Sequence, residues 1–107
     1  MAVEIYKTTK KFPKEETYSL TDQMRRATIS VTSNVAEGFG RQTYKEKIQF
    51  YYVASGSLTE LKNQIILAKD VSYLSQNDFA ILMELSDNVH RLLNPRKTPQ
   101  SEHFLII

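Results

Sequence analysis

The stretch Gln23–Gly38, QMRRATISVTSNVAEG, is the part of the chain that decides the fold. At 100° per residue, its larger apolar side chains and the preceding Leu20 fall on one narrow stripe of a helix. That stripe can bury against neighbouring helices, and it consists of Leu20, Met24, Ala27, Val31, Val35 and Gly38. Ile29 and Ala36 lie on nearly the opposite side. Because a surface helix of a monomer needs only one apolar face, this second face points to further contacts.

The remaining periodic segments predict three further helices. Pro13 ends the first of them, because the residue before a proline is biased out of the helical region. Thr43 and Glu46 form a capping box that opens the third, and Gly38 and Gly40 are typical of the end of the second. We therefore predict an all-α, antiparallel up-down four-helix bundle with a shortened first helix, its helices lying near residues 2–11, 20–39, 43–73 and 77–93.

The chain of 107 residues is long enough for one domain with a modest core. Residues 1–94 contain the predicted helices and form the bundle. Residues 95–107 have two prolines and no helical period, so we predict an irregular C-terminal tail there. Within the third helix, Gly56 costs roughly 1 kcal/mol relative to alanine. We expect this cost to be offset by a close approach of another helix, for which a missing side chain is useful.

The composition leaves little room for a metal or a cofactor. The chain has no cysteine, which excludes disulfides and thiolate metal sites. Its two histidines, His90 and His103, have no obvious ligand partners, and the Glu-x-x-His pairs of metal-binding bundles are missing. No apolar run approaches the roughly 20 residues of a membrane span, and the charged N-terminal segment is unlike a signal peptide. We expect a cytoplasmic protein with no cofactor, no metal and no membrane contact.

The charge is uneven, because residues 1–47 hold nine Lys and Arg against six Asp and Glu. Such an excess can support a phosphate-binding face. Arg26 could form a phosphate clamp with Arg41 and Lys45. The alternative is an ion pair of Arg26 with a carboxylate, such as Glu37 or Glu60, that fixes helix packing. The candidate nucleic-acid-binding residues are Arg25, Arg26, Arg41, Lys45 and Lys47.

Two further polar positions belong to the helical motif. Asn34 lies at the border of the core stripe, and we expect it to hydrogen-bond a neighbouring helix and to set the register. Glu37 would need a second group for acid–base catalysis. Glu60 could be that partner or a metal co-ligand, but no nucleophile accompanies the pair. We therefore expect no enzymatic activity.

Four sequence blocks, in order, resemble a known family. They are PKEE followed by a tyrosine, LxxQMRRA, SxxSNxAEGxGR and AxGSLxEL, at Phe12–Glu16 with Tyr18, Leu20–Ala27, Ser30–Arg41 and Ala54–Leu61. This pattern is similar to the four-helix-bundle family named for proteins encoded in intervening sequences of bacterial 23S ribosomal RNA genes. The resemblance covers roughly residues 3–93. Family members usually carry two to three more helical turns before Val3, so either the start of this chain is late or its first helix is truncated.

The resemblance implies an up-down bundle, a ring-shaped homo-oligomer and no established enzymatic activity. The accessory protein of diversity-generating retroelements is similar, and that relative is a basic pentamer that binds nucleic acid and a reverse transcriptase. We therefore expect a non-catalytic homo-oligomer that binds RNA or DNA through basic residues, and the expected oligomer is a pentamer. The alternative is a structural or adaptor oligomer that binds a partner protein and has no direct nucleic-acid role.

The exposed apolar and aromatic residues bear on both alternatives. Ile29, Tyr52 and Ile66 lie off the core stripes, and the tail ends in Phe104–Ile107. A monomer would expose them together, beyond the apolar surface that is usual for one. The tyrosines at positions 44, 51 and 52 lie near basic residues and could stack bases. More often such tyrosines are half-buried interface anchors, which is the interpretation we favour.

Overall fold

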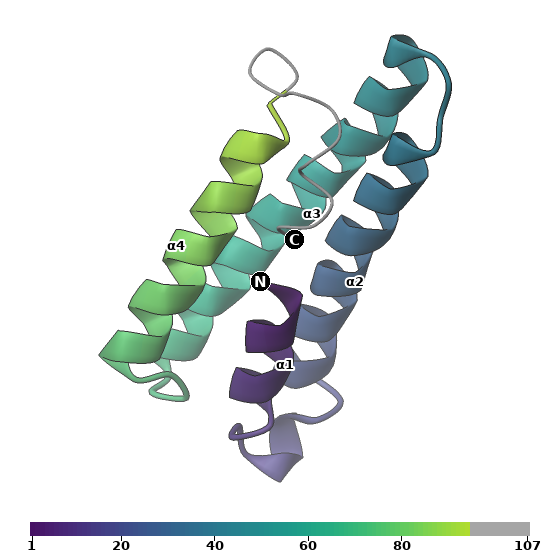
Figure 1. The fold of residues 1–107 in the computed structure, drawn as a ribbon. Helices are drawn as coiled ribbons and strands as arrows, with labels where there is room; N and C mark the ends of the chain where they lie inside the picture. Colours follow the sequence, from purple (N-terminus) through teal and green to yellow (C-terminus); the bar gives the residue numbers. More distant parts are fainter. Residues whose placement is uncertain (95–107) are drawn as a thin grey trace.

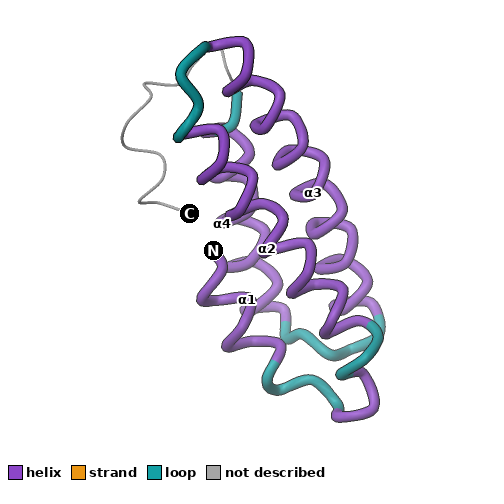
Figure 2. Tube along the Cα trace, turned by 90° about the vertical axis from the view of Figure 1, so that its right-hand side faces the viewer, coloured by secondary structure: helices purple, strands orange, loops and turns teal. Residues whose placement is uncertain are grey.

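The computed structural model describes residues 1–94, which form four α-helices joined end to end by short connections. They are α1 (Ala2–Thr9), α2 (Leu20–Phe39), α3 (Tyr44–Asp70) and α4 (Gln76–Leu92), with a short 3-10 helix, η1 (Lys14–Glu16), before α2. Consecutive helices run in opposite directions (Figure 1), and their connections lie at the two ends of the bundle (Figure 2). Residues 1–94 contain no strand. The predicted all-α up-down bundle with a shortened first helix is confirmed, whereas the predicted tail lies outside the described residues.

The helix bounds agree closely with the predicted ones except at the end of α3, which lies at Asp70 and not at the predicted residue 73. The backbone leaves the helix at Ser72, whose φ of 68° is left-handed. The Ser72 amide donates to the Lys69 carbonyl at 2.9 Å, and the Tyr73 amide donates to the Ala68 carbonyl at 2.8 Å. These two bonds make a Schellman motif, which usually has glycine at the left-handed position. Since serine stands at this position, no glycine marks the end of α3 in the sequence.

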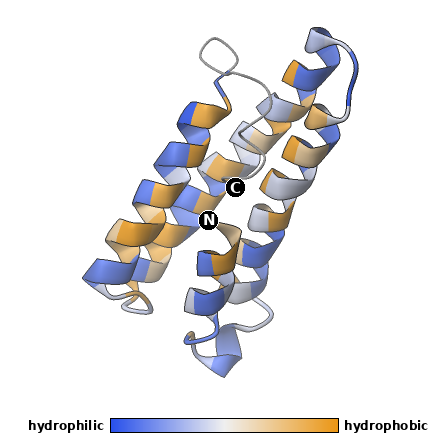
Figure 3. Ribbon diagram, viewed as in Figure 1, coloured by the Kyte–Doolittle hydropathy of each residue, from blue (hydrophilic) through white to orange (hydrophobic). Residues whose placement is uncertain are grey.

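The core is built along the predicted stripes. In α2, Met24 and Val31 are fully buried, while Leu20 is half-buried at the bundle end. The most deeply buried side chains of α3 are Leu58, Leu61 and Ile65, and α4 contributes Leu82 and Val89. Apolar and polar residues alternate along each helix in the manner of amphipathic helices (Figure 3). Among residues 1–94, no helix combines the length and apolar character needed to cross a membrane.

A close approach of two helices occurs at Gly38 and not at Gly56. α2 and α3 share the most extensive contact in the bundle. A Cβ atom at Gly38 would lie 2.7 Å from the Tyr51 ring and 3.0 Å from the Phe50 Cβ, closer than atoms can pack. Gly56 is exposed, and a Cβ built there would meet no atom within 4 Å. The expectation that Gly56 serves a close approach is therefore wrong for contacts within this chain, because the residue lies on the outer surface of α3.

Gly38→Ala tests this approach, with Gly40→Ala as a matched control two residues away. At Gly40 the backbone is right-handed, with φ of −78°, and an added Cβ would lie 3.7 Å from the nearest carbonyl oxygens. Gly38→Ala forces the Tyr51 ring or α3 outward, so we expect a loss of about 1–3 kcal/mol in unfolding free energy by urea denaturation. Gly40→Ala should leave it within about 0.5 kcal/mol. Equal effects of the two changes would contradict the close approach.

Candidate nucleic-acid interface

The corner between α2 and α3, residues 40–47, gathers three of the five basic candidates and is named here the basic turn; it comprises the connection, residues 40–43, and the first turn of α3. It contains Arg41, Lys45 and Lys47. The fold of the turn is fixed by Thr43, whose hydroxyl accepts a hydrogen bond from the Glu46 amide at 3.2 Å. This is the predicted N-cap of α3, and it satisfies one of the free amides at the helix start.

Arg41 and Lys47 both make contacts that hold the turn together. Arg41 donates to Glu37 at 3.1 Å, and its guanidinium lies 4.7 Å from the centre of the Phe50 ring. The Lys47 ammonium donates to the Phe39 carbonyl at 2.8 Å, at the C-terminus of α2. A cation there is favourable because it complements the helix dipole.

Two cations of the basic turn remain available to an anion. Lys45 is exposed and makes no ion pair with any residue that the structure describes. The ion pair of Arg41 with Glu37 is an exposed one, with 45% of the arginine side chain and 60% of the glutamate side chain accessible. Since exposed pairs contribute about 0.2–1 kcal/mol, exchanging Glu37 for a phosphate costs Arg41 little.

The other two basic candidates lie elsewhere. Arg25 makes its contacts with α1. It donates hydrogen bonds to the Thr9 hydroxyl at 3.0 Å and to the Tyr6 carbonyl at 3.3 Å. Its guanidinium also lies 4.7 Å from the centre of the Tyr6 ring. It thereby ties α1 to α2. Arg26 donates to Asp22 at 2.9 Å, one turn earlier on α2.

The structure does not bring Arg26 to the basic turn. Arg26 lies about 20 Å along α2 from the end of the helix, so it cannot form a phosphate clamp with Arg41 and Lys45. The alternative expectation, an ion pair of Arg26 with a carboxylate, is met by Asp22 on the adjacent turn and not by Glu37 or Glu60, so the pair does not link two helices. Arg26 therefore pairs within its own helix, at the i,i+4 spacing that favours ion pairs.

Asn34 and Glu60 also bond within their own helices. The Asn34 amide donates to the Ser30 carbonyl at 2.8 Å, so the predicted bond to a neighbouring helix is not made by Asn34. Ser30 provides that link instead, since its hydroxyl lies 2.6 Å from the hydroxyl of Ser57 on α3. Glu60 accepts from Gln64 at 3.2 Å. Glu60 and Glu37 therefore have separate partners.

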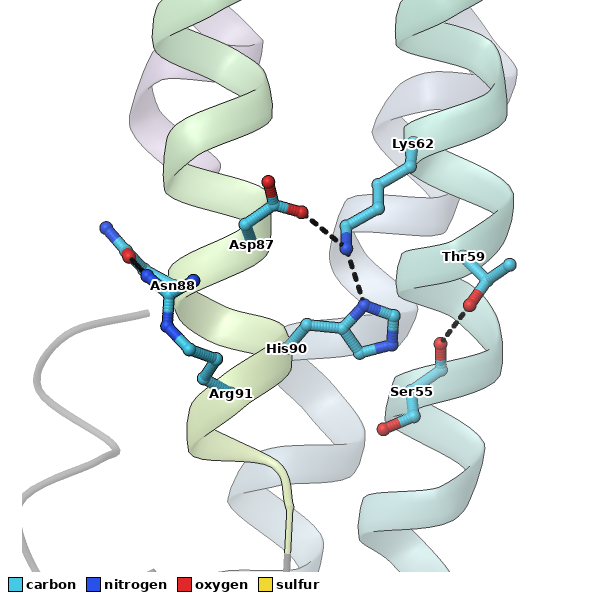
Figure 4. A network of polar contacts seen from close by, with 7 residues as sticks. All are labelled: Ser55, Thr59, Lys62, Asp87, Asn88, His90 and Arg91. Atoms are coloured by element: carbon cyan, nitrogen blue, oxygen red, sulfur yellow. Dashed lines mark hydrogen bonds and ion pairs between the residues drawn. The ribbon is translucent and has the colours of Figure 1, made fainter. Parts of the chain in front are cut away.

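A polar network that sequence reasoning missed joins α3 to α4 (Figure 4). The Lys62 ammonium lies 2.7 Å from the Asp87 carboxylate and 2.6 Å from Nδ1 of His90. Only the spacing of Asp87 and His90, one turn apart on α4, was visible in the sequence. Lys62 precedes His90 by 28 residues, so its part depended on the register of two helices.

The network changes the proton affinity of its members. Burial and the Lys62 ammonium lower the pKa of His90 below its ordinary 6.5. The hydrogen bond from Lys62 lowers the pKa of Asp87 below 3.8. An ammonium group only donates, so Nδ1 of His90 accepts, and the neutral ring carries its proton on Nε2. Within residues 1–94, no group of three histidine, aspartate and glutamate side chains could hold a metal ion.

These features define an up-down helical bundle with a basic turn at one end and a partly buried polar network between α3 and α4. Over residues 1–95 the chain matches the family described as 23S rRNA-intervening sequence protein, and it belongs to that family. No curated protein gives a significant match.

The lowered pKa of His90 makes a pH-dependence prediction. Between its folded value and 6.5, the unfolded chain binds more protons than the folded one, so the free energy of unfolding falls as the pH drops below about 6.5. Urea denaturation of the wild type at pH 7.5 and 5.5 should show this fall, and His90→Gln should reduce it. Asp87 acts at lower pH, near and below 3.8, and is common to both proteins. The same pH dependence in both proteins would contradict the assignment.

Proposed function

We propose that this chain is a non-catalytic, homo-oligomeric bundle of the cytoplasm that binds RNA or DNA through its basic turn. The observation that carries the proposal is the gathering of Arg41, Lys45 and Lys47 at one end of the bundle. Arg91, in the last turn of α4, does not join this group, because it lies on the side of α4 that faces away from α3 (Figure 4). Two carboxylates, Glu37 and Glu46, share the region. The net positive charge is therefore modest and suits contacts with a few phosphates.

Charge reversal in the basic turn tests the nucleic-acid role. Arg41→Glu with Lys45→Glu should abolish retention of labelled RNA on a filter and leave the helical circular-dichroism signal intact. Wild-type retention should fall steeply with salt, because phosphate contacts release counterions. Lys7→Glu with Lys14→Glu is the matched control, since both lysines are exposed and lie away from the turn. Retention that the turn variant leaves unchanged would favour the adaptor function.

Self-association is supported by the outer face of α3. Tyr52, Val53 and Leu67 are 62%, 53% and 48% exposed, and Gly56 lies among them without a neighbour. A glycine in mid-helix costs stability, and no contact within the chain offsets that cost. Ile29 on α2 is half exposed as well. A second copy packed against this face would bury the apolar side chains and use the space at Gly56. A closed head-to-tail ring satisfies this requirement, and the resemblance implies a pentamer.

Gly56→Leu separates the role of this face from the fold of the single chain. The leucine has open space on the isolated chain and a better helix propensity than glycine, so the helix should remain intact. We expect the mass from light scattering to fall from that of an oligomer towards one chain, and Ile29→Asp to act in the same direction. Ala80→Leu, at an exposed position of α4, is the control and should leave the mass unchanged. A wild-type monomer at micromolar concentration would overturn the proposal of an oligomer.

The exposed apolar face also favours the second candidate function, an adaptor oligomer that binds a partner protein. Faces of this kind mark protein–protein contact sites. The two functions differ in the basic turn, which an adaptor would not need. The charge-reversal experiment therefore distinguishes them.

A further inference from the structure

The exposed apolar side chains of α3 fall into two separate stripes. Val53, Leu67 and Val71 are exposed and form the first, named here the α2-side stripe. Tyr52 and Ile66 are exposed and form the second, named the α4-side stripe. Taken at 100° per residue, each stripe stays within about 40° along the helix, and the sequence neighbours Tyr52 and Val53 are about 100° apart. One helix therefore presents apolar side chains in two directions.

The two stripes lie beside different neighbours, because α3 contacts α2 along one flank and α4 along the other. Leu67 and Val71 line a cavity of about 270 Å³ that also includes Leu20 of α2. Tyr52 lines a cavity of about 560 Å³ that also includes Leu93 of α4. Each stripe thus borders a hollow, and side chains of a second copy can pack there in the way that ridges pack into grooves.

The hollows on the α2 side are lined by carboxylates. Glu16 belongs to the lining of the cavity that Leu67 borders. An adjoining cavity is lined by Asp22 and Glu60, and the described residues around it include one cation, Arg26. Two copies joined through their α2-side stripes would bring these carboxylates towards one another, which is unfavourable.

The hollow on the α4 side differs in charge. Among the described residues that line it, none is a carboxylate. Its His90 has the Lys62 ammonium at 2.6 Å, and Lys62 is in turn paired with Asp87. This side of α3 has no excess of negative charge, so it can meet the α2 side of another copy without repulsion.

The presence of two unlike stripes also bears on the symmetry of the contact. An isologous contact uses the same patch on both copies, so a dimer of that kind would cover one stripe and leave the other exposed. A heterologous contact, in which one patch meets the other, covers both stripes on every copy that has two neighbours. The apolar surface and the charges of α3 therefore favour the same arrangement.

We propose that copies of this chain associate head-to-tail through α3, with the α2-side stripe of one copy packed against the α4-side stripe of the next. This inference rests on the self-association proposed above and adds which two surfaces meet. A repeated contact of this kind closes into a ring when the rotation between copies divides a full turn.

The experiment blocks one stripe at a time. Val53→Glu blocks the α2-side stripe and Tyr52→Glu blocks the α4-side stripe, and both positions are exposed, so the helical circular-dichroism signal should be kept. By light scattering, each variant alone should have the mass of one chain. An equal mixture of the two should have the mass of two chains. In the mixture, Tyr52→Glu copies keep an intact α2-side stripe and Val53→Glu copies keep an intact α4-side stripe.

Ile66→Glu provides the matched control, because Ile66 belongs to the same stripe as Tyr52 and is also exposed. A mixture of Ile66→Glu with Tyr52→Glu contains no intact α4-side stripe, so it should keep the mass of one chain. A mixture of Ile66→Glu with Val53→Glu should again reach the mass of two chains.

Each outcome has a definite meaning. A wild type with the mass of one chain overturns both the proposed self-association and this inference. Single variants that keep the mass of the wild type overturn the inference alone. A mixture of Val53→Glu with Tyr52→Glu that stays at one chain does the same, because the two substitutions then damage one shared patch. A two-chain mass in the mixture of Ile66→Glu with Tyr52→Glu also contradicts the assignment of the stripes.

Discussion

The close approach of α2 and α3 at Gly38 is the constraint on which the basic end of the molecule depends. Gly38 lies in the last turn of α2, where the Tyr51 ring leaves no room for a side chain. Because the two helices nearly touch there, Lys47 on α3 can reach the last carbonyls of α2. Lys47 therefore links the first turn of α3 to the last turn of α2, across the connection between the two helices. The corner that carries these cations is also held by the Thr43 cap of α3.

Much of this fold could be predicted from the sequence. The 3.6-residue period placed the core stripes, and the threonine cap gave the start of α3. The 3.6-residue period does not reveal which residues of different helices come into contact. Gly38 and Gly56 look alike in the sequence, yet one is against a tyrosine ring and the other is on the surface. The end of α3 was placed too late because Ser72 adopts the left-handed conformation without the glycine that usually marks it.

The candidate site was predicted in part, for a similar reason. The basic residues Arg41, Lys45 and Lys47 stay near one another in space because they are within seven residues of one another along the chain. Residues related across helices were assigned less well. Arg25 is taken by α1, which only the packing of the first helix reveals. The network of Lys62, Asp87 and His90 needs the register between α3 and α4, and no pattern in a single sequence gives that register.

The short first helix has a consequence for how the molecule can change. α1 packs on α2 and α4 at the end of the bundle away from the basic turn. Within residues 1–94, a cross-section of the bundle therefore contains four helices at that end and three helices at the other. The four-helix end contains Arg25, which joins α1 to α2. A substitution at this end therefore changes the packing of several helices at once. The three-helix end holds the cations of the basic turn. Sequence variation can accumulate at the three-helix end while the four-helix end maintains the fold, so the end that carries the basic turn can change with less effect on the structure.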